Sequence, residues 1–253
     1  MRQYLLSICF DGTDFHGWQY QPNAVTVQEL LHSALKLLCG SEVPPPLGCS
    51  RTDAGVHAEV FCCTVRTEKE WACPALVRAL NGNLPRTVRV LGCEEVALDF
   101  HPRYDCTGKR YRYQLWNAAA ENPFLLRYSY HERFPLDAQR LNELAQPLLG
   151  THDFSAFCAA GAGTKTSVRT VTRADFARRG DLLLFTVQAD GFLYNMVRIM
   201  AGTLLQCAKA PHSLPPIEQI IAGRERKNAG VTLPPQGLFL EWVGYQDREY
   251  KGV

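Results

Sequence analysis

The sequence predicts an α+β protein built from two tandem ferredoxin-like units, each with the element order βαββαβ. Two observations predict this class. Short alternating apolar segments and amphipathic helical segments follow one another in this order in the first half of the chain, and the same order returns in the second half. We expect the two units to form one mixed or antiparallel sheet with helices on one face. The other face would then be a cleft free to hold a large ligand.

The first unit is expected over residues 1–104. It begins with a strand over residues 4–10, whose alternate residues are apolar. Thr26 and Glu29 form a capping box at the start of a helix that Gly40 ends. The remaining elements are a short strand over 46–49, a strand over 59–66, a helix from Pro74 to about 81–82, and a strand over 88–96.

The second unit is expected over residues 105–253. Its first strand, 109–116, alternates between Tyr111 and Tyr113 on one face and arginines on the other. The hairpin around 179–181 is typical of two antiparallel strands. The remaining elements are a helix that begins at Asp137, strands over 169–178 and 182–189, helices over 193–208 and 217–222, and a last strand over 238–245.

The composition is that of an ordinary globular protein, because hydrophobic residues make up 46% and charged residues 21% of the 253 positions. No segment is long and apolar enough to cross a bilayer, and the N-terminus lacks the pattern of a signal peptide. We therefore expect a cytoplasmic protein without a membrane partner. The ten cysteines form no C-x-x-C pair, which indicates free thiols in a reducing compartment.

The formal net charge of only +2 does not by itself indicate a nucleic-acid partner. Local basic clusters do occur, although each alone is as typical of a solvated face. One cluster comprises Arg103, Lys109, Arg110 and Arg112, and the other Lys165, Arg169, Arg173, Arg178 and Arg179.

The segment 49–58 is the most unusual in the chain. It places Arg51, Asp53 and His57 within seven residues, in a loop between two predicted strands. A structural loop needs turn formers such as Asp and Gly but has no need of the arginine and histidine as well. The structural alternative is that Asp53 caps a turn and pairs with Arg51.

This loop closely resembles the signature of the tRNA pseudouridine synthase A family. Six further segments resemble motifs of that family in the same order, so the resemblance covers nearly the whole chain. They are residues 10–19, 81–85, 99–104, 109–113, 191–198 and 237–240. Departures from the family pattern are Ser50, Pro102 and Tyr104, where Gly, Ala and Phe are usual.

The resemblance implies that the protein converts uridine in tRNA to pseudouridine, with Asp53 as the nucleophile. Moving the glycosidic link from N1 to C5 needs no redox change, so neither cofactor nor metal is expected; a carboxylate supplies the covalent catalysis. Arg198 matches the arginine that keeps this aspartate ionised, Tyr111 matches a tyrosine that stacks on the target base, and Leu240 matches an apolar residue of the base pocket. From the residues alone, Arg198 could snorkel to solvent, and Tyr111 and Leu240 could be ordinary core.

The resemblance also implies RNA contacts and a substrate. Arg51 would fill the space of the flipped base. Residues matching tRNA-touching segments are Phe100, His101, Arg103, Tyr104 and Lys165. The small residues 158–164 suit a loop that orders on RNA. The implied substrate is the anticodon stem-loop at tRNA positions 38 to 40, and the implied assembly is a homodimer.

Three rival interpretations stay open. The chain could be a non-catalytic RNA-binding or tRNA-chaperone module on the same scaffold. It could be a metal-dependent hydrolase that uses His16, His57 and His101, although these lack paired ligand spacing. It could also be a paralogue that modifies other uridines.

Overall fold

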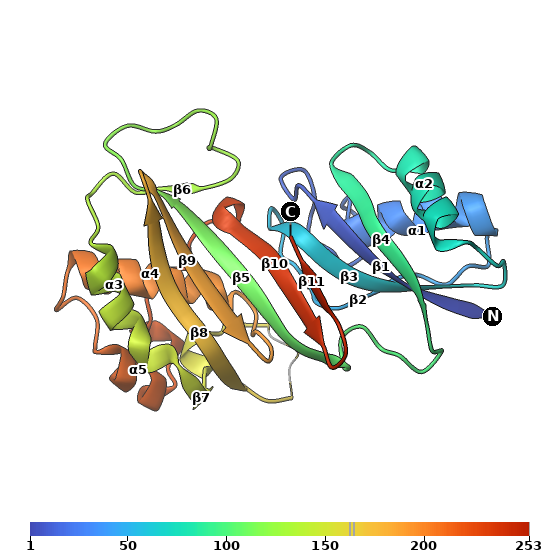
Figure 1. Ribbon diagram of the computed structural model, residues 1–253. Coiled ribbons are helices and arrows are strands. Elements are labelled where there is room, and N and C mark those ends of the chain that lie inside the picture. Colours follow the sequence, from blue (N-terminus) through green and yellow to red (C-terminus); the bar gives the residue numbers. More distant parts are fainter. Residues whose placement is uncertain (162, 164, 253) are drawn as a thin grey trace. The chain divides into compact units, whose positions relative to one another are not determined.

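The computed structural model describes residues 1–161, 163 and 165–252. This part of the chain forms five α-helices and eleven strands in parallel and antiparallel pairs, which confirms the predicted α+β class (Figure 1). None of the helices described is long and apolar enough to span a membrane. The helices are α1 (Val27–Cys39), α2 (Cys73–Asn83), α3 (Ala138–Ala145), α4 (Met196–Lys209) and α5 (Ile217–Gly223). The strands are β1 (Arg2–Phe10), β2 (Leu47–Gly48), β3 (His57–Thr67), β4 (Val88–Val96), β5 (Cys106–Trp116), β6 (Tyr130–His131), β7 (Gly150–Asp153), β8 (Val168–Arg179), β9 (Leu182–Ala189), β10 (Leu238–Tyr245) and β11 (Glu249–Lys251).

The chain divides into two compact units. Unit 1 comprises residues 1–107 and 239–253, and unit 2 comprises residues 108–238. The last strand, which the sequence pattern associates with the second repeat, therefore packs largely within unit 1. Its residues Phe239 and Leu240 pair in parallel with the first two residues of β3.

Unit 1 has the strand order β4-β1-β3, in which β1 is antiparallel to both neighbours. The predicted second strand of this unit is reduced to the two residues of β2, which pair with the far end of β3. The predicted caps of α1 are present. The Thr26 hydroxyl accepts a hydrogen bond from the amide of Glu29, and Gly40 ends the helix at φ 100°.

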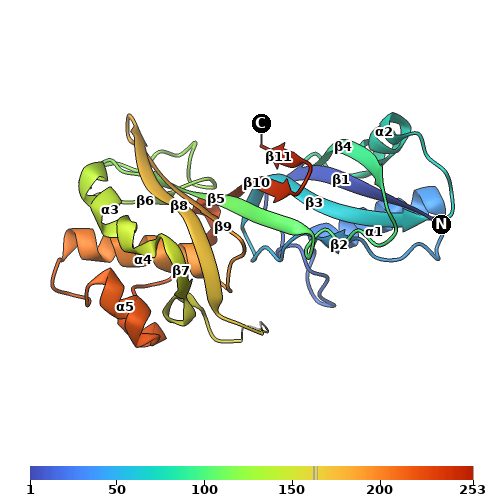
Figure 2. The same cartoon turned by 60° about the horizontal axis from the view of Figure 1, so that its bottom comes forward.

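Unit 2 has the strand order β5-β9-β8-β7, with all three pairings antiparallel. Tyr111, Tyr113 and the residues opposite them in β9 are buried on one face. Helix α3 packs on β8 and contacts α4, and Figure 2 shows α3, α4 and α5 on the same side of these strands. The other face carries polar side chains, so helices cover one face of this sheet.

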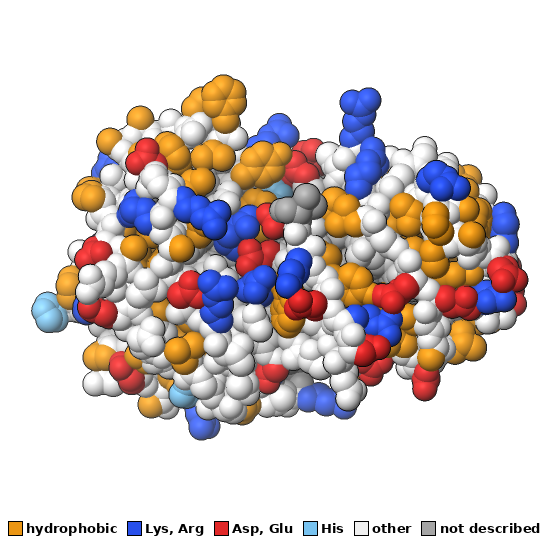
Figure 3. Space-filling model, in the orientation of Figure 1, with side chains coloured by type: hydrophobic (Ala, Val, Ile, Leu, Met, Phe, Trp, Pro, Cys, Tyr) orange, Lys and Arg blue, Asp and Glu red, His pale blue; other side chains and the backbone are white. Residues whose placement is uncertain are grey.

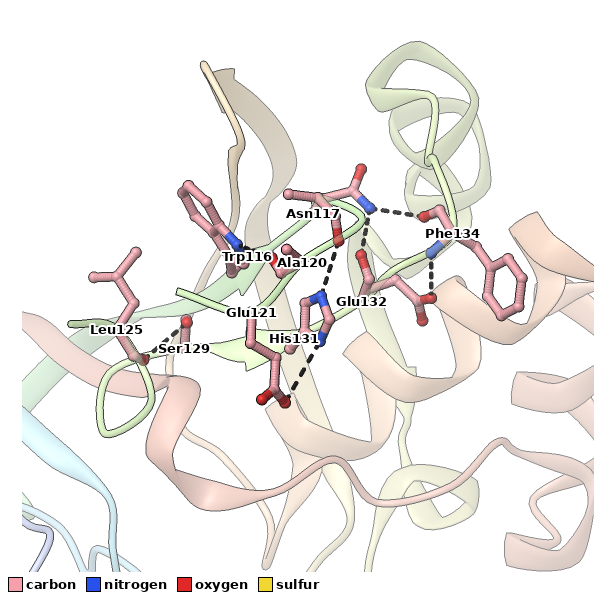
Figure 4. A network of polar contacts seen from close by, with 10 residues as sticks. Trp116, Asn117, Ala120, Glu121, Leu125, Ser129, His131, Glu132 and Phe134 are labelled. Atoms are coloured by element: carbon pink, nitrogen blue, oxygen red, sulfur yellow. Dashed lines mark hydrogen bonds and ion pairs between the residues drawn. The ribbon is translucent and has the colours of Figure 1, made fainter. Parts of the chain in front are cut away.

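Residues 117–136 carry no predicted element, yet a polar network orders them (Figure 4). The Asn117 amide donates to the carbonyl oxygens of Glu132 and Phe134 at 2.8 and 2.7 Å. The Glu132 carboxylate is buried and accepts a hydrogen bond from Lys209 Nζ at 2.6 Å. This ion pair ties the segment to the last turn of α4. Burial of the Glu132 charge is tolerated because it is paired with the more exposed Lys209.

Helix α4 lies in close backbone contact with the segment 229–233. A Cβ added to Gly202 would lie 2.0 Å from the carbonyl oxygen of Val231. The amide of Gly230 donates to the Thr203 hydroxyl at 2.9 Å, and that hydroxyl donates to Ile199 O one turn back. The segment that leads into β10 is therefore held against α4.

We predict that Gly202→Ala destabilises the protein by about 2 kcal/mol. Alanine ordinarily stabilises a helix interior by about 1 kcal/mol relative to glycine, but overpacking at this contact costs about 1–3 kcal/mol and more where backbone must move. Gly82→Ala in α2 is the matched control, because nothing lies within 4 Å of its added Cβ. Urea unfolding should show a loss for the first variant and a small gain for the second. Equal gains would refute the close contact.

Candidate functional site

The Asp53 loop, residues 49–56, connects β2 to β3. At its start, the amide of Cys49 donates to Cys62 O at 2.8 Å, and at its end the amide of Val56 donates to Asp53 O at 3.2 Å. Asp53 is half-buried, whereas Arg51 is exposed. The loop therefore has anchored ends and presents a carboxylate and a guanidinium near the surface.

A second loop, residues 11–18, holds the Asp53 loop through its backbone. Trp18 N donates to Thr52 O at 3.3 Å, and Gly55 N donates to Phe15 O at 3.1 Å. The two backbones approach so closely that side chains are excluded between them. A Cβ on Gly12 would lie 2.0 Å from Val56 O, and one on Gly17 would lie 2.1 Å from Thr52 O. Glycine is therefore required at both positions.

His57 holds the end of the Asp53 loop. Its side chain is 2% exposed, and its ring stacks on Phe239 with centroids 4.6 Å apart. The amide of Gly12 donates to Nδ1 at 3.0 Å. Because a ring nitrogen that accepts a hydrogen bond carries no proton, we assign Nδ1 as unprotonated. Asp11 Oδ1 also lies 3.2 Å from the same nitrogen. His57 orders the loop from inside the core.

Leu240 lies close in the fold to the end of the Asp53 loop. It pairs with Ala58 across the parallel β10–β3 contact and is fully buried. The register thus brings a residue from the end of the chain beside the strand that the Asp53 loop enters.

The segment 100–104 forms a turn at one end of unit 1. The amides of Arg103 and Tyr104 donate to His101 Nδ1 at 3.1 and 3.4 Å. The Phe100 ring packs on Tyr245 at 5.2 Å. Arg103 and Tyr104 are exposed, with Tyr104 77% accessible. The turn therefore uses Phe100 and His101 for its own structure and presents Arg103 and Tyr104 to solvent.

The family departures are accommodated without strain in this part of unit 1. Pro102 is buried, and its carbonyl oxygen accepts a hydrogen bond from Tyr245 Oη at 2.9 Å. Burial raises the pKa of the Tyr245 phenol, which therefore stays a donor. The Tyr104 ring packs at a tilt against His101, with ring centroids 4.2 Å apart. Ser50 is half-buried, at the edge of the Asp53 loop.

In unit 2, β5 positions two tyrosines on the face that carries α4. Tyr113 is fully buried, and its hydroxyl donates to Pro234 O at 2.7 Å. Burial raises the pKa of this phenol, and the nearby positive charge of Arg198 offsets part of the shift. Tyr111 is 5% exposed and meets the Phe192 ring edge-on at 5.0 Å. Tyr113 is thus core, and Tyr111 is also buried on this face.

Arg198 lies in the first turn of α4, which begins after Asn195 in the left-handed conformation at φ 62°. Its Nε donates to Leu233 O at 2.7 Å, and its Nη1 donates to Asn195 Oδ1 at 2.6 Å. The half-buried guanidinium is therefore held in place and does not extend into solvent as a snorkelling side chain would.

The helix-free face of unit 2 is polar and carries arginines. Across β5, β9 and β8, Arg110, Gln188 and Arg173 lie in one row, and Arg112, Thr186 and Asp175 lie in the next row on the same face. Figure 3 shows Lys and Arg side chains over these strands, with Asp and Glu among them. Positive charge is thus concentrated on this face, which explains how the protein has a basic surface although its net charge is small.

Lys165 is exposed, next to the small-residue segment 158–164. The prediction that this segment orders on RNA falls partly on positions 162 and 164, which lie outside the described residues.

Sequence reasoning missed the residues that support the site. The roles of Gly12, Gly17 and Phe239 depend on contacts between segments far apart in sequence, whereas Asn195 contacts Arg198, three residues later. Gly12 and Gly17 belong to the motif at 10–19, but glycine is required there because the backbone of a loop some 40 residues later approaches so closely. Only the co-occurrence of the two motifs could have indicated this requirement from the sequence. No described residues form a group of three or more His, Cys, Asp or Glu arranged to hold a metal ion.

Comparisons with known proteins agree with one another. A family model described as tRNA pseudouridine synthase matches residues 7–105 and 144–246. These stretches contain Asp53, Arg198 and Leu240, while Tyr111 lies between them. The tRNA pseudouridine synthase A of Acetivibrio thermocellus is 43% identical over 97% of this chain and the whole of that protein. Those of Exiguobacterium sibiricum and Thermoanaerobacter sp. strain X514 are each 40% identical, over 100% and 97% of this chain and the whole of each relative.

We predict that Gly17→Ala releases the Asp53 loop, because its Cβ would collide with Thr52 O. Hydrogen exchange at the amides of Trp18 and Gly55 should then accelerate about tenfold or more. Gly40→Ala is the matched control, since Gly40 also has positive φ but open space around its Cβ. The two variants share the backbone strain of roughly 1–2 kcal/mol. Equal acceleration in both would show that strain, and not the contact, is responsible.

Proposed function

Because the chain belongs to the tRNA pseudouridine synthase family and is an isomerase that acts on tRNA uridine, we propose that Asp53 is its catalytic nucleophile. The reaction breaks the bond from N1 to C1′ and forms a bond from C5 to C1′. The hydrogen on C5 leaves to solvent, and N1 gains a proton. Atoms and electrons balance without an external reagent, so the only covalent chemistry required is that of a carboxylate acting as a nucleophile on the base or the sugar.

The observation that carries this proposal is the anchoring of the Asp53 loop. Asp53 lies on a loop whose position depends on backbone contacts with residues 11–18 and on His57 beneath it. A nucleophile needs such a fixed position, since misplacement by about 1 Å can reduce the rate about 10²-fold. A loop that merely binds RNA has no requirement for a half-buried carboxylate, which repels phosphates. The geometry therefore favours an enzyme over a non-catalytic binding module.

We assign the residues of unit 2 and β10 to substrate binding. Tyr111 is proposed to stack on the unpaired target base, as the family resemblance implies. Arg198, held by Leu233 and Asn195, is proposed to keep the nucleophile ionised, as the family resemblance implies. Leu240 is proposed to support the base pocket from β10. This division gives unit 1 the nucleophile and unit 2 the tyrosine and arginine.

Exposed cations and aromatic residues are proposed to hold the RNA. Arg103, Tyr104 and Lys165 are exposed, and the Arg110 and Arg112 row lies on the helix-free face of unit 2. Phosphate contacts of this kind make binding depend on salt. Phe100 and His101 contribute by shaping the turn. Arg51, exposed beside Asp53, is proposed to occupy the space left by the flipped base.

The finer specificity follows from family resemblance. We propose that the substrate is the anticodon stem-loop at positions 38 to 40, that the protein acts in the cytoplasm, and that it works as a homodimer. A homodimer suits the small net charge, because a partner subunit would add basic surface to each site.

We predict that Asp53→Asn lowers the rate of tritium release from tRNA carrying 5-tritiated uridine by about 10³-fold or more. The amide has the same shape but is a poor nucleophile, so tRNA affinity should stay within a few-fold. Asp181→Asn in the exposed β8–β9 hairpin makes the same chemical change and should leave the rate unaltered. Undiminished release by Asp53→Asn would exclude it as the nucleophile. Absence of release by the wild type, with binding retained, would favour a paralogue with another target.

We predict that Arg51→Ala impairs base flipping. Its rate should fall about 10-fold or more when the target uridine is paired in a stem, and much less when the same uridine is mismatched, because a mismatched base leaves the stack more easily. Arg179→Ala, another exposed arginine, should show no such difference. Equal losses on both substrates would mean that Arg51 only binds phosphate.

A further inference from the structure

Two thiols of unit 1 face each other between α2 and β4. Tyr4 in β1 points toward α2, because its hydroxyl bonds the backbone of Trp71 just before that helix. Leu6 lies two residues further and so points to the same face. Cys93 of β4 is directly opposite Leu6 in the antiparallel register, so its side chain lies on this face too.

The alignment of α2 along β4 brings Cys73 to the same level. Near the end of α2, the Asn81 side chain bonds both backbone groups of Val90 at 2.8 and 2.9 Å. Cys73 is the first residue of α2, about 12 Å back along the helix axis from Asn81 at 1.5 Å per residue. Cys93 is three residues beyond Val90, about 10 Å along the strand at 3.3 Å per residue. This alignment places both side chains at the same level on one face, and interaction with the Cys73 side chain contributes to raising the pKa of the Cys93 thiol.

Cys73 and Cys93 are each only partly buried, so neither residue is fully closed off from solvent. By contrast, Cys49, Cys62 and Cys63 in the same unit are fully buried within the sheet. Figure 1 shows that α2 and β4 lie at the margin of unit 1, with β4 as an edge strand. A small oxidant can therefore approach this pair.

We propose that Cys73 and Cys93 form a reversible disulfide, a redox-responsive link that joins the start of α2 to β4. With a low-molecular-weight disulfide as the oxidant, the Cys73 thiolate attacks one of its sulfurs and releases one small thiol. Cys93 then loses its proton to solvent and attacks Cys73 Sγ, which releases the second small thiol. The protein loses two electrons and two protons, and the small disulfide gains them.

The order of attack follows from the environment of Cys93. Burial, and then the neighbouring Cys73, raise the pKa of the Cys93 thiol, so Cys93 holds its proton while Cys73 reacts first.

The link should stabilise the protein without altering the isomerase. It closes a chain loop that contains the whole of α2, which restricts the unfolded state. The Asp53 loop enters β3, which β1 separates from β4. We therefore expect the isomerase rate to be the same in the oxidised and reduced proteins.

The test is oxidation of the full chain with glutathione disulfide, followed by peptide mass spectrometry. We expect a Cys73–Cys93 linked peptide, a mass lower by two hydrogens, and an apparent melting temperature raised by roughly 5–10 °C. Dithiothreitol should reverse all three changes, and Cys73→Ser or Cys93→Ser should abolish them. Cys39→Ser, which removes another partly buried thiol, should retain them.

Glutathione adducts spread over the exposed cysteines, without the linked peptide, would overturn the proposal. So would a melting shift that persists in both serine variants. Tritium release by the oxidised and reduced proteins should be equal. Failure to detect the linked peptide would not argue against the isomerase assignment. Loss of isomerase activity in Asp53→Asn would not argue against the disulfide.

Discussion

The close backbone contact between residues 11–18 and the Asp53 loop is the constraint on which the rest of the site depends. Gly12 and Gly17 allow it, because any side chain at either position would occupy the space of the opposing carbonyl oxygens. The contact satisfies backbone groups of both loops, which would otherwise need water. The short, irregular Asp53 loop is thereby held in a fixed position, as a helix or strand would be.

The last strand of the chain supports this contact between the two loops. His57 accepts a hydrogen bond from Gly12 and stacks on Phe239 of β10. The sheet pairing of β10 with β3 is therefore linked to the loop contact through a single imidazole ring. In unit 2 the segment before β10 is held in turn by Arg198 and Tyr113, through the carbonyl oxygens of Leu233 and Pro234. Arg198, which is assigned to substrate binding, and the core residue Tyr113 thus both position the chain that leads to β10.

The arginines of unit 2 have different roles, depending on where they lie in the sheet. Arg110 and Arg112 of β5 and Arg173 of β8 lie on the helix-free face of unit 2, while Arg178 of β8 donates hydrogen bonds to Asn117 and Leu136. A count of basic residues would not separate these roles, since only their strand register and partners distinguish a ligand-facing arginine from a structural one.

The sequence by itself determined the α+β class, most element positions and the candidate nucleophile. Alternation and caps are local properties, so the strands 88–96 and 238–245, the cap at Thr26 and the cap at Asp137 could be located from neighbouring residues. The motif around Asp53 identified the family, which the comparisons confirm. Only the tertiary structure decided that β10 packs beside β3, that residues 117–136 are ordered through Asn117, and that Gly12 and Gly17 serve the Asp53 loop. The physical reason is that these features depend on contacts between distant segments, whose energies appear only when the backbone is folded.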